Sequence, residues 1–391
     1  MHTGNIGEDV VASVAEVAAD FAKERSQRGS RSALDGADFE KLAAAGYLKT
    51  GVPVSAGGIW VDGPTTIPQC CRMARALGAA DPSLALVTTM HPAVLAFWLF
   101  DPVAPAPYTS AWAAQRQSIF DGVLSGAWWG TIASEPGSGG DLSDSRVVAA
   151  PTGGGGYTLT GDKHMGSGSG ITSFMLTVGR PKGEEETEVF LMDVRDAKWD
   201  GSTGMKLVRQ WDGYGMMATQ SHAFRFDDYP VTRFAWPGRG LVVVPQVMPL
   251  VLTLFTSVTL GILDAAMSVA KTFIERAPTS LRPIERVSWV RAENQYWLAQ
   301  QAWDGVLRAI SASDRPDVAA ARGKLVVAEL AESVLEALSK SVGAKTFSRS
   351  LPFGQWTQDV RALGFLRPPW GLAYDQLFEM SLGAAAAHDE G

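Results

Sequence analysis

Residues 134–141 have the sequence Ser134-Glu135-Pro136-Gly137-Ser138-Gly139-Gly140-Asp141, and this stretch is the strongest indication of the fold. It is a glycine-rich turn that follows the segment Trp128-Trp129-Gly130-Thr131, which has the character of a strand. Glycines leave such a turn open to a flat ring, because no side chain stands between the ring and the backbone. A tight β turn without a ligand has the same composition, so the stretch predicts a ring-binding turn only together with other motifs.

Two more glycine-rich segments follow this turn. Residues 161–170 have the sequence GDKHMGSGSG, in which Ser167 stands between two glycines and could present its hydroxyl to a heteroaromatic nitrogen. Residues 213–221 have the sequence GYGMMATQS and lead into a strand that ends with FDDYPV over 226–231. Each segment borders a predicted strand, so all three motifs fall within one β-rich part of the chain.

The character of the sequence changes twice, which predicts three domains. Residues 1–125 have apolar side chains at three- and four-residue spacing, which is typical of amphipathic helices. Residues 126–240 are rich in glycine, β-branched and aromatic residues, which predicts a small antiparallel β domain. Residues 241–391 contain long helical stretches with apolar faces, which predicts a four-helix bundle and an α+β fold overall. The expected helices are 9–21, 38–45, 65–77, 82–100, 247–277, 284–312 and 317–342, and the expected strands are 157–160, 174–178, 189–192 and 222–226.

Composition limits the function. The chain has 391 residues and a net charge of −7, which disfavours nucleic-acid binding because such binding normally requires a basic face. The only cysteines, Cys70 and Cys71, are adjacent, so neither a disulfide framework nor a metal cluster is expected. The N-terminus does not resemble a signal peptide, and polar residues and prolines interrupt the apolar stretches 84–100 and 242–263. We therefore expect a cytoplasmic enzyme without a membrane span.

The three motifs, in this order and spacing, resemble those of the acyl-CoA dehydrogenase superfamily. Members of that superfamily have a Thr/Ser-Glu-Pro-Gly-x-Gly-Ser-Asp turn and then a Gly-x-Lys-x-x-x-Thr/Ser-Asn/Gly segment. A Gly-x-Arg-x-Ser/Thr segment that leads to Phe-x-Asp-Val-x-Val-Pro completes the set. The resemblance spans essentially the whole chain, because the flanking helical regions also fit. It implies a flavoenzyme in which a helical domain, a β domain and a helical bundle enclose the flavin.

The resemblance also implies which residues contact the flavin. Ser167 takes the place of the hydroxyl that bonds flavin N5, and Met165 replaces an aromatic residue that packs on the ring. Gly140 replaces a serine that faces the substrate. Arg276 matches an arginine that reaches the pyrophosphate of a neighbouring subunit's FAD, although a solvated charge at a helix end is the alternative. The remaining implied positions are Thr131, Ala133, Ser134, Gly139 and Gly343.

One family feature is missing from the sequence. Desaturation of a thioester needs a carboxylate to remove the α-proton while hydride moves to flavin N5. At the usual position of that glutamate, counted from Asp359, the chain has Arg367, and at the alternative position it has Val251-Leu252. An arginine stays protonated at neutral pH and cannot act as a general base. Arg367 could instead bind an anionic substrate or a reduced-flavin anion, or it could pair with Asp359 or Asp375.

A second branch of the superfamily also lacks this glutamate. Its members use reduced flavin and oxygen as monooxygenases, and they have a segment similar to Ser167-Gly168-Ser169 and a histidine in the helix before the β domain. The matching histidine is His91, whose imidazole could hydrogen-bond an oxygen adduct of the flavin or take a substrate proton. A core histidine with satisfied hydrogen bonds beside the kink at Pro92 is the alternative. The resemblance thus implies catalytic roles for His91, Ser167 and Arg367.

We therefore expect a flavin-dependent oxidoreductase, and favour a monooxygenase that acts on an aromatic or CoA-linked small molecule. An acyl-CoA dehydrogenase with a displaced base, such as Asp375 or Glu379, and a non-catalytic scaffolding relative are the alternatives. The expected cofactor is FAD. In the family the catalytic glutamate opens a Glu-Gly-Thr segment whose threonine contacts the flavin, and the loss of that segment here leaves FMN open. A flavin reductase is a candidate partner. A homodimer or homotetramer is also expected, because Arg276 and Gly343 would serve a neighbour's flavin.

Overall fold

The N-terminal part of the chain is helical, as its apolar spacing predicts. The structure is a computed structural model, and it describes residues 6–153, 155–276, 278–366 and 368–386. Asp62 and Asp81 begin the two most buried helices of this part, because each accepts a hydrogen bond from an amide of the first turn. The helices are α1 (Ile6–Lys23), α2 (Arg25–Gly29), α3 (Gly36–Ala44), α4 (Gly63–Ala80), α5 (Pro82–Leu99) and α6 (Thr109–Leu124).

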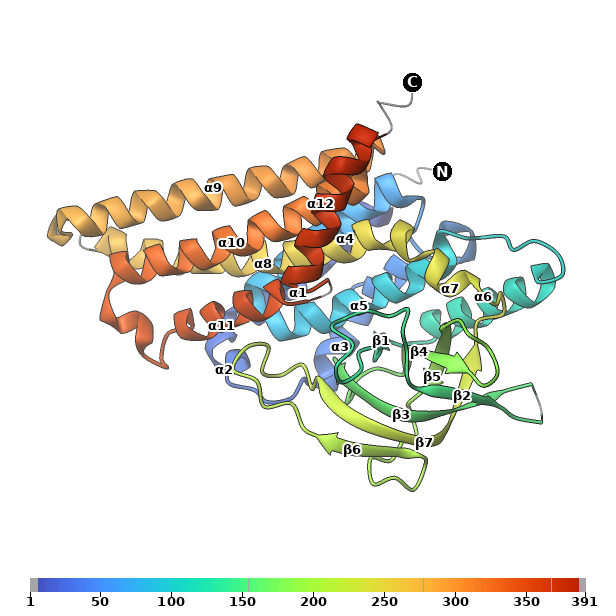
Figure 1. Cartoon of the computed structure of the whole chain (residues 1–391). Coiled ribbons are helices and arrows are strands. Elements are labelled where there is room, and N and C mark those ends of the chain that lie inside the picture. Colours follow the sequence, from blue (N-terminus) through green and yellow to red (C-terminus); the bar gives the residue numbers. More distant parts are fainter. Residues whose placement is uncertain (1–5, 154, 277, 367, 387–391) are drawn as a thin grey trace.

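The middle of the chain forms a β domain that lies below the helices (Figure 1). The pairings β4–β2, β2–β3, β3–β7, β7–β5 and β5–β4 close a ring of strands, and the side chains inside it form a core of their own. Most pairs are antiparallel as expected, but β4 runs parallel to both β1 and β2. The strands are β1 (Trp129–Thr131), β2 (Val148–Pro151), β3 (Tyr157–Gly166), β4 (Phe174–Pro181), β5 (Glu188–Asp193), β6 (Met205–Arg209) and β7 (His222–Arg233).

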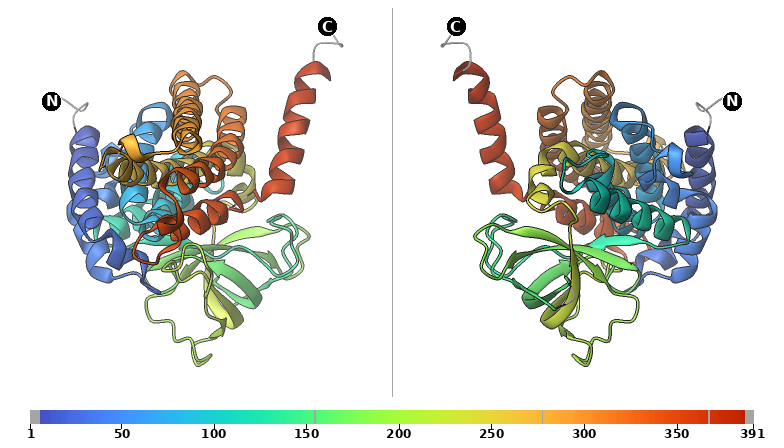
Figure 2. Two further views of the ribbon diagram at one scale, coloured as in Figure 1. Left: turned by 90° about the vertical axis from the view of Figure 1, so that its left-hand side faces the viewer. Right: turned by 90° about the vertical axis from the view of Figure 1, so that its right-hand side faces the viewer.

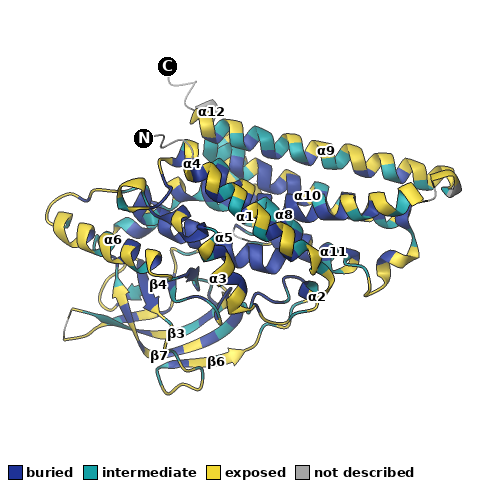
Figure 3. Ribbon diagram, turned by 180° about the vertical axis from the view of Figure 1, so that it is seen from behind, coloured by how far each residue is buried: buried dark blue, intermediate teal, exposed yellow. Residues whose placement is uncertain are grey.

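Long helices follow the β domain. The core helix α8 is buried along most of its length, and α9 lies on the outside of the bundle (Figure 3). The last helix, α12, stands away from the rest of the bundle (Figure 2). The elements are α7 (Arg239–Val242), α8 (Val244–Arg276), α9 (Pro283–Ala312), α10 (Pro316–Val342), the turn η4 (Ala344–Phe347), α11 (Phe353–Gly364) and α12 (Trp370–Ala386).

The bundle is not built from the C-terminal part alone. Helix α4 crosses α8 at two glycines: a Cβ on Gly261 would lie 2.1 Å from the Arg75 carbonyl oxygen, and a Cβ on Gly78 would lie 2.6 Å from the Val258 carbonyl oxygen. No larger residue permits this approach, so the N-terminal and C-terminal helices share one core. The long helices α8, α9, α10 and α11 pack on one another as the sequence predicts, and α4, from residues 63–80, packs along α8 in addition.

Two helices are long and apolar enough to cross a membrane, by length and composition alone. These are α5 and α8, and the most apolar windows of the two helices are 94 % and 83 % buried inside the protein. Burial against other helices accounts for their composition, because a core helix has the same apolar surroundings as a membrane span.

Candidate active site

A buried ion pair joins the first motif to the second. The Lys163 ammonium on β3 lies 2.6 Å from Glu135 Oε1 in the turn after β1, and the two side chains are 0 % and 5 % exposed. Glu135 also accepts hydrogen bonds from the Ser145 hydroxyl at 2.5 Å and the Arg146 amide at 2.8 Å. Burial raises the pKa of Glu135, but these donors outweigh burial and lower it below its usual value. The charged carboxylate therefore holds the glycine-rich turn against β3.

The glycine-rich turn itself follows a path that suits glycine. Gly137, Gly139 and Gly140 have positive φ angles of 76°, 62° and 97°. A Cβ on Gly140 would lie 3.1 Å from Pro369 Cδ, so the turn approaches the segment between α11 and α12. A Cβ on Gly139 would meet no atom within 4 Å. The turn thus exposes bare backbone, as a surface for a flat ring requires.

Ser167 is the first member of a chain of three hydroxyl groups. Its Oγ lies 2.8 Å from Ser221 Oγ, which lies 2.7 Å from Thr219 Oγ1. The Thr219 hydroxyl donates to the Met216 carbonyl oxygen at 2.9 Å, and the Gly168 amide donates to the Thr219 carbonyl oxygen at 2.7 Å. The second and third motifs are therefore in direct contact, and Ser167 itself is only 8 % exposed.

A cavity of about 360 Å³ lies where the three motifs meet. This volume falls in the range of about 300–1,000 Å³ that small-molecule sites occupy. Met165, which is 51 % exposed, offers an apolar surface there, and Trp211 and the cation Arg209 line the cavity with it. The apolar surface, the half-buried Ser221 hydroxyl and the cation are features that fit a flavin, and the glycine-rich turn adjoins the cavity at Pro136. The motif residues on the wall are Pro136, Lys163, His164, Met165 and Ser221.

Sequence reasoning missed several residues of this wall. Trp211 and Arg209 precede the third motif, and neither has a spacing that would distinguish it from a surface residue. Trp211 is positioned by its indole nitrogen, which donates to the Met216 carbonyl oxygen at 2.9 Å. His164 also lines the cavity and is half-buried. The signal for His164 was available, because it adjoins Lys163 in the second motif.

The other motif positions lie in and beside β1. Thr131 ends β1 and is half-buried, and Ala133 packs against the helical core. The Ser134 carbonyl oxygen accepts the His164 amide at 2.9 Å, which links the first motif to β3 a second time. The flavin contacts predicted for these residues stay predictions, but all three lie on the segment that leads into the glycine-rich turn.

His91 has the alternative, structural role. Its side chain is 0 % exposed, its Nε2 lies 3.1 Å from the Leu48 carbonyl oxygen, and its Nδ1 accepts the Trp129 amide at 3.2 Å. Both ring nitrogens are thus committed to backbone groups, with Nε2 carrying the proton. Burial lowers the pKa of His91 to about 4, so the ring is neutral at neutral pH. This geometry does not support the catalytic role that the sequence suggested, because neither nitrogen can reach a substrate.

Arg276 and Gly343 come together in the structure. The Arg276 guanidinium lies over the Phe273 ring, 5.7 Å from its centroid, and the Lys345 ammonium lies over the same ring at 4.2 Å. Gly343 begins the turn that contains Lys345. This basic pair lies at the end of the bundle that is remote from the β domain (Figure 1).

The structure locates most of the positions at which a general base was considered. Arg367 lies outside the described residues. Leu252 is buried and Val251 half-buried in α8, so the alternative family position has no carboxylate. Asp375 and Glu379 are exposed on α12. Asp359 is fully buried and accepts the Met216 amide at 2.6 Å, and its burial raises its pKa to about 7.

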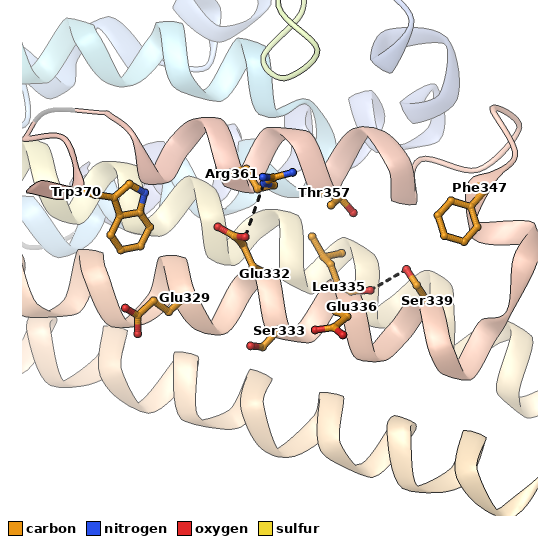
Figure 4. Close-up of a pocket in the computed structure, with 10 residues that line it drawn as sticks. All are labelled: Glu329, Glu332, Ser333, Leu335, Glu336, Ser339, Phe347, Thr357, Arg361 and Trp370. Atoms are coloured by element: carbon orange, nitrogen blue, oxygen red, sulfur yellow. Dashed lines mark hydrogen bonds and ion pairs between the residues drawn. The ribbon is translucent and has the colours of Figure 1, made fainter.

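A second cavity, of about 630 Å³, lies between α10 and α11 (Figure 4). Three glutamates of α10, Glu329, Glu332 and Glu336, line it, and the Arg361 guanidinium lies 3.8 Å from Glu332. Its wall contains none of the residues of the three motifs. The smaller cavity also has two carboxylates on its wall, Asp162 and Asp212, but the motif residues line it, so we place the candidate active site there.

The chain is similar in sequence and in fold to several known proteins. Residues 130–229, which include all three motifs, match the family described as the acyl-CoA dehydrogenase middle domain. A dibenzothiophene monooxygenase from Rhodococcus qingshengii is 25% identical over 307 residues, which cover 73% of this chain and 68% of that protein.

Two solved structures share the fold. FMN-bound TdsC from Paenibacillus sp. A11-2 has a TM-score of 0.78 and 19% identity, with 96% of this chain and 97% of that one covered. Butyryl-CoA dehydrogenase from Megasphaera elsdenii has a TM-score of 0.81 and 17% identity, with 96% and 98% covered.

The fold and these matches define the class: the chain has an acyl-CoA dehydrogenase-like fold, and its middle part matches that family's middle domain. Its sequence is similar to that of a dibenzothiophene monooxygenase, and its fold is similar to that of TdsC.

Proposed function

We propose that the protein is a monooxygenase that uses reduced flavin and O₂ to oxygenate an aromatic or CoA-linked small molecule. The observation that carries the proposal is that residues of three flavin-type motifs line one cavity, while the buried carboxylate of Glu135, next to Pro136 on its wall, is already paired with Lys163. A carboxylate with a lowered pKa and three donors is a poor proton acceptor, so it does not replace the missing base of a dehydrogenase.

The residues at and beside the cavity would have separate roles. The flavin, when bound, supplies two electrons and the carbon at which O₂ is activated. The bare backbone of Gly139 and Gly140 would admit the ring, Met165 would cover it, and the Ser167 hydroxyl would face N5. Arg209 places a permanent positive charge on the wall, which suits a phosphate or an anionic substrate. The dry interior behind Ser167 would exclude water from the reacting centre.

The proposal is tested by two reactions of the same purified protein. Oxidised flavin bound to the protein should not be bleached by saturated acyl-CoAs without oxygen. Reduced flavin bound to the protein should consume O₂ and convert an aromatic probe such as dibenzothiophene to an oxygenated product. Rapid anaerobic bleaching with formation of a 2-enoyl-CoA would contradict the proposal and return the protein to the dehydrogenases. Failure to bind either FMN or FAD would remove the functional claim altogether.

The cofactor and the assembly form part of the proposal. A structure of similar fold is FMN-bound, so FMN is the first flavin to test, with FAD beside it. Arg276 and Lys345 would bind phosphate groups of a flavin held by a second copy, because they lie far from the cavity of their own chain. The active unit would then be a homodimer or homotetramer in the cytoplasm, with reduced flavin supplied by a reductase.

A further inference from the structure

We infer that Thr219 and Ser221 are positioning residues that make Ser167 a hydrogen-bond acceptor and so select the reduced form of the flavin. The inference rests on the proposed function, in which the Ser167 hydroxyl faces flavin N5. The two residues do not need to touch the flavin. They act through the proton order of the hydroxyl chain that ends at the Met216 carbonyl oxygen.

The proton order follows from counting donors. A carbonyl oxygen can only accept, and Thr219 Oγ1 lies 2.9 Å from that of Met216, so the single Thr219 proton lies between them. Ser221, 2.7 Å from Thr219, must then donate to Thr219. Ser167, 2.8 Å from Ser221, must in turn donate to Ser221. All three protons therefore point along the chain toward the Met216 carbonyl oxygen, and Ser167 is left with lone pairs for any further partner.

The far end of the chain is fixed in place. The Met216 amide donates to the buried carboxyl of Asp359 at 2.6 Å, and the Met216 carbonyl oxygen also accepts the Trp211 indole N–H at 2.9 Å. Thr219 is 0 % exposed, so water does not offer its hydroxyl another acceptor. Reversal of the three protons would leave two oxygen atoms facing each other at 2.9 Å without a hydrogen between them.

This order distinguishes the two redox states of the isoalloxazine ring. Reduced flavin has a hydrogen on N5 and can donate to the Ser167 lone pair, whereas oxidised flavin has a lone pair on N5 and needs a donor. A monooxygenase that receives flavin in the reduced form would benefit from this preference. One neutral hydrogen bond gained in one state alone corresponds to about a threefold to tenfold difference in affinity.

The test compares the dissociation constants of oxidised FMN and of chemically reduced FMN, both without oxygen. In the wild type, reduced FMN should bind about threefold to tenfold more tightly than oxidised FMN. A tenfold preference raises the two-electron midpoint potential of the bound flavin by about 30 mV over that of free FMN. Thr219→Val removes the acceptor of the Ser221 proton and should bring the ratio of the two constants close to one. Ser221→Ala frees Ser167 to donate and should do the same.

Thr172→Val is the matched control. The Thr172 hydroxyl is buried in the same turn and donates to the Gly168 carbonyl oxygen at 3.1 Å, outside the chain. It should change both constants in parallel and leave their ratio unchanged. An unchanged ratio in folded Thr219→Val and Ser221→Ala, or a wild type that prefers oxidised FMN, would overturn the inference. Binding of neither form by any variant would instead count against the proposed function, and Ser221→Ala alone decides the matter if Thr219→Val does not fold.

Discussion

The buried ion pair between Lys163 and Glu135 gives the sharpest prediction for stability. Lys163→Met leaves the Glu135 carboxylate charged and 5 % exposed, with only the Ser145 hydroxyl and the Arg146 amide as donors. Loss of one partner of a buried pair costs about 3–5 kcal/mol. The two remaining donors place the expected loss at the lower end, about 3 kcal/mol at pH 7.5. Urea unfolding followed by tryptophan fluorescence measures it.

The pH dependence of this loss has a defined sign. In the wild type the pKa of Glu135 is lowered, so its contribution is present above the unfolded pKa and is lost as pH falls. In Lys163→Met, burial raises that pKa instead, and protonation relieves the unpaired charge. The difference between variant and wild type should therefore shrink between about pH 7.5 and pH 5.

Two further variants complete this experiment. The double variant Glu135→Gln with Lys163→Met removes both charges and should be clearly more stable than the sum of the single variants implies. Lys206→Met is the control, because Lys206 is exposed on β6 and its loss should change stability by about 0.5 kcal/mol or less. A loss below about 1 kcal/mol in Lys163→Met, or strict additivity in the double variant, would refute the reasoning.

The remaining predictions concern the site and the assembly. His91→Asn should leave the pH profile of activity unchanged between about pH 6 and 8. The wild type loses stability as pH falls from about 6.5 towards the folded-state pKa of about 4, because the unfolded chain binds a proton at His91 first. His91→Asn should lessen that loss of stability. Ser167→Ala should weaken binding of reduced flavin by about 0.5–1.5 kcal/mol in a fluorescence titration. Arg276→Ala should weaken FAD binding more than FMN binding, and equal losses would exclude a pyrophosphate contact. Light scattering should show at least a dimer, and a fully active monomer would contradict a shared site.

The arrangement of elements was predictable from the sequence wherever the apolar pattern was strong. Helices α5, α9 and α10 begin and end within two residues of the predicted ranges, because proline and aspartate mark their starts. The strands β2 and β6 were missed, since both are short and have a mixed exposure pattern. The packing of α4 on α8 could not be predicted from the sequence either. It depends on Gly78 and Gly261, which are far apart in the sequence and have no local signature.

The site was predictable in its motifs but not in its polar network. The resemblance located Ser167 and the glycine-rich turn; the turn reaches the cavity at Pro136, and Ser167 bonds Ser221 on the cavity wall. It could not reveal that Glu135 is paired with Lys163, or that Ser167 shares a chain with Thr219. Such pairings depend on how three segments meet in space. His91 shows the opposite error, because a family position suggested chemistry where the backbone uses both ring nitrogens.

The hydrogen bond from the Met216 amide to Asp359 joins the loop of the third motif to α11, and its consequence is cooperative unfolding. A Cβ on Gly215 would lie 2.4 Å from the Gln358 carbonyl oxygen, so the loop and the helix are in close contact as well as bonded. Separation of the two would leave a buried amide and a buried carboxyl without partners, at a cost that neither segment can recover alone. The amides of residues 215–219 should therefore exchange with solvent only when α11 itself opens, as a single unit of local unfolding.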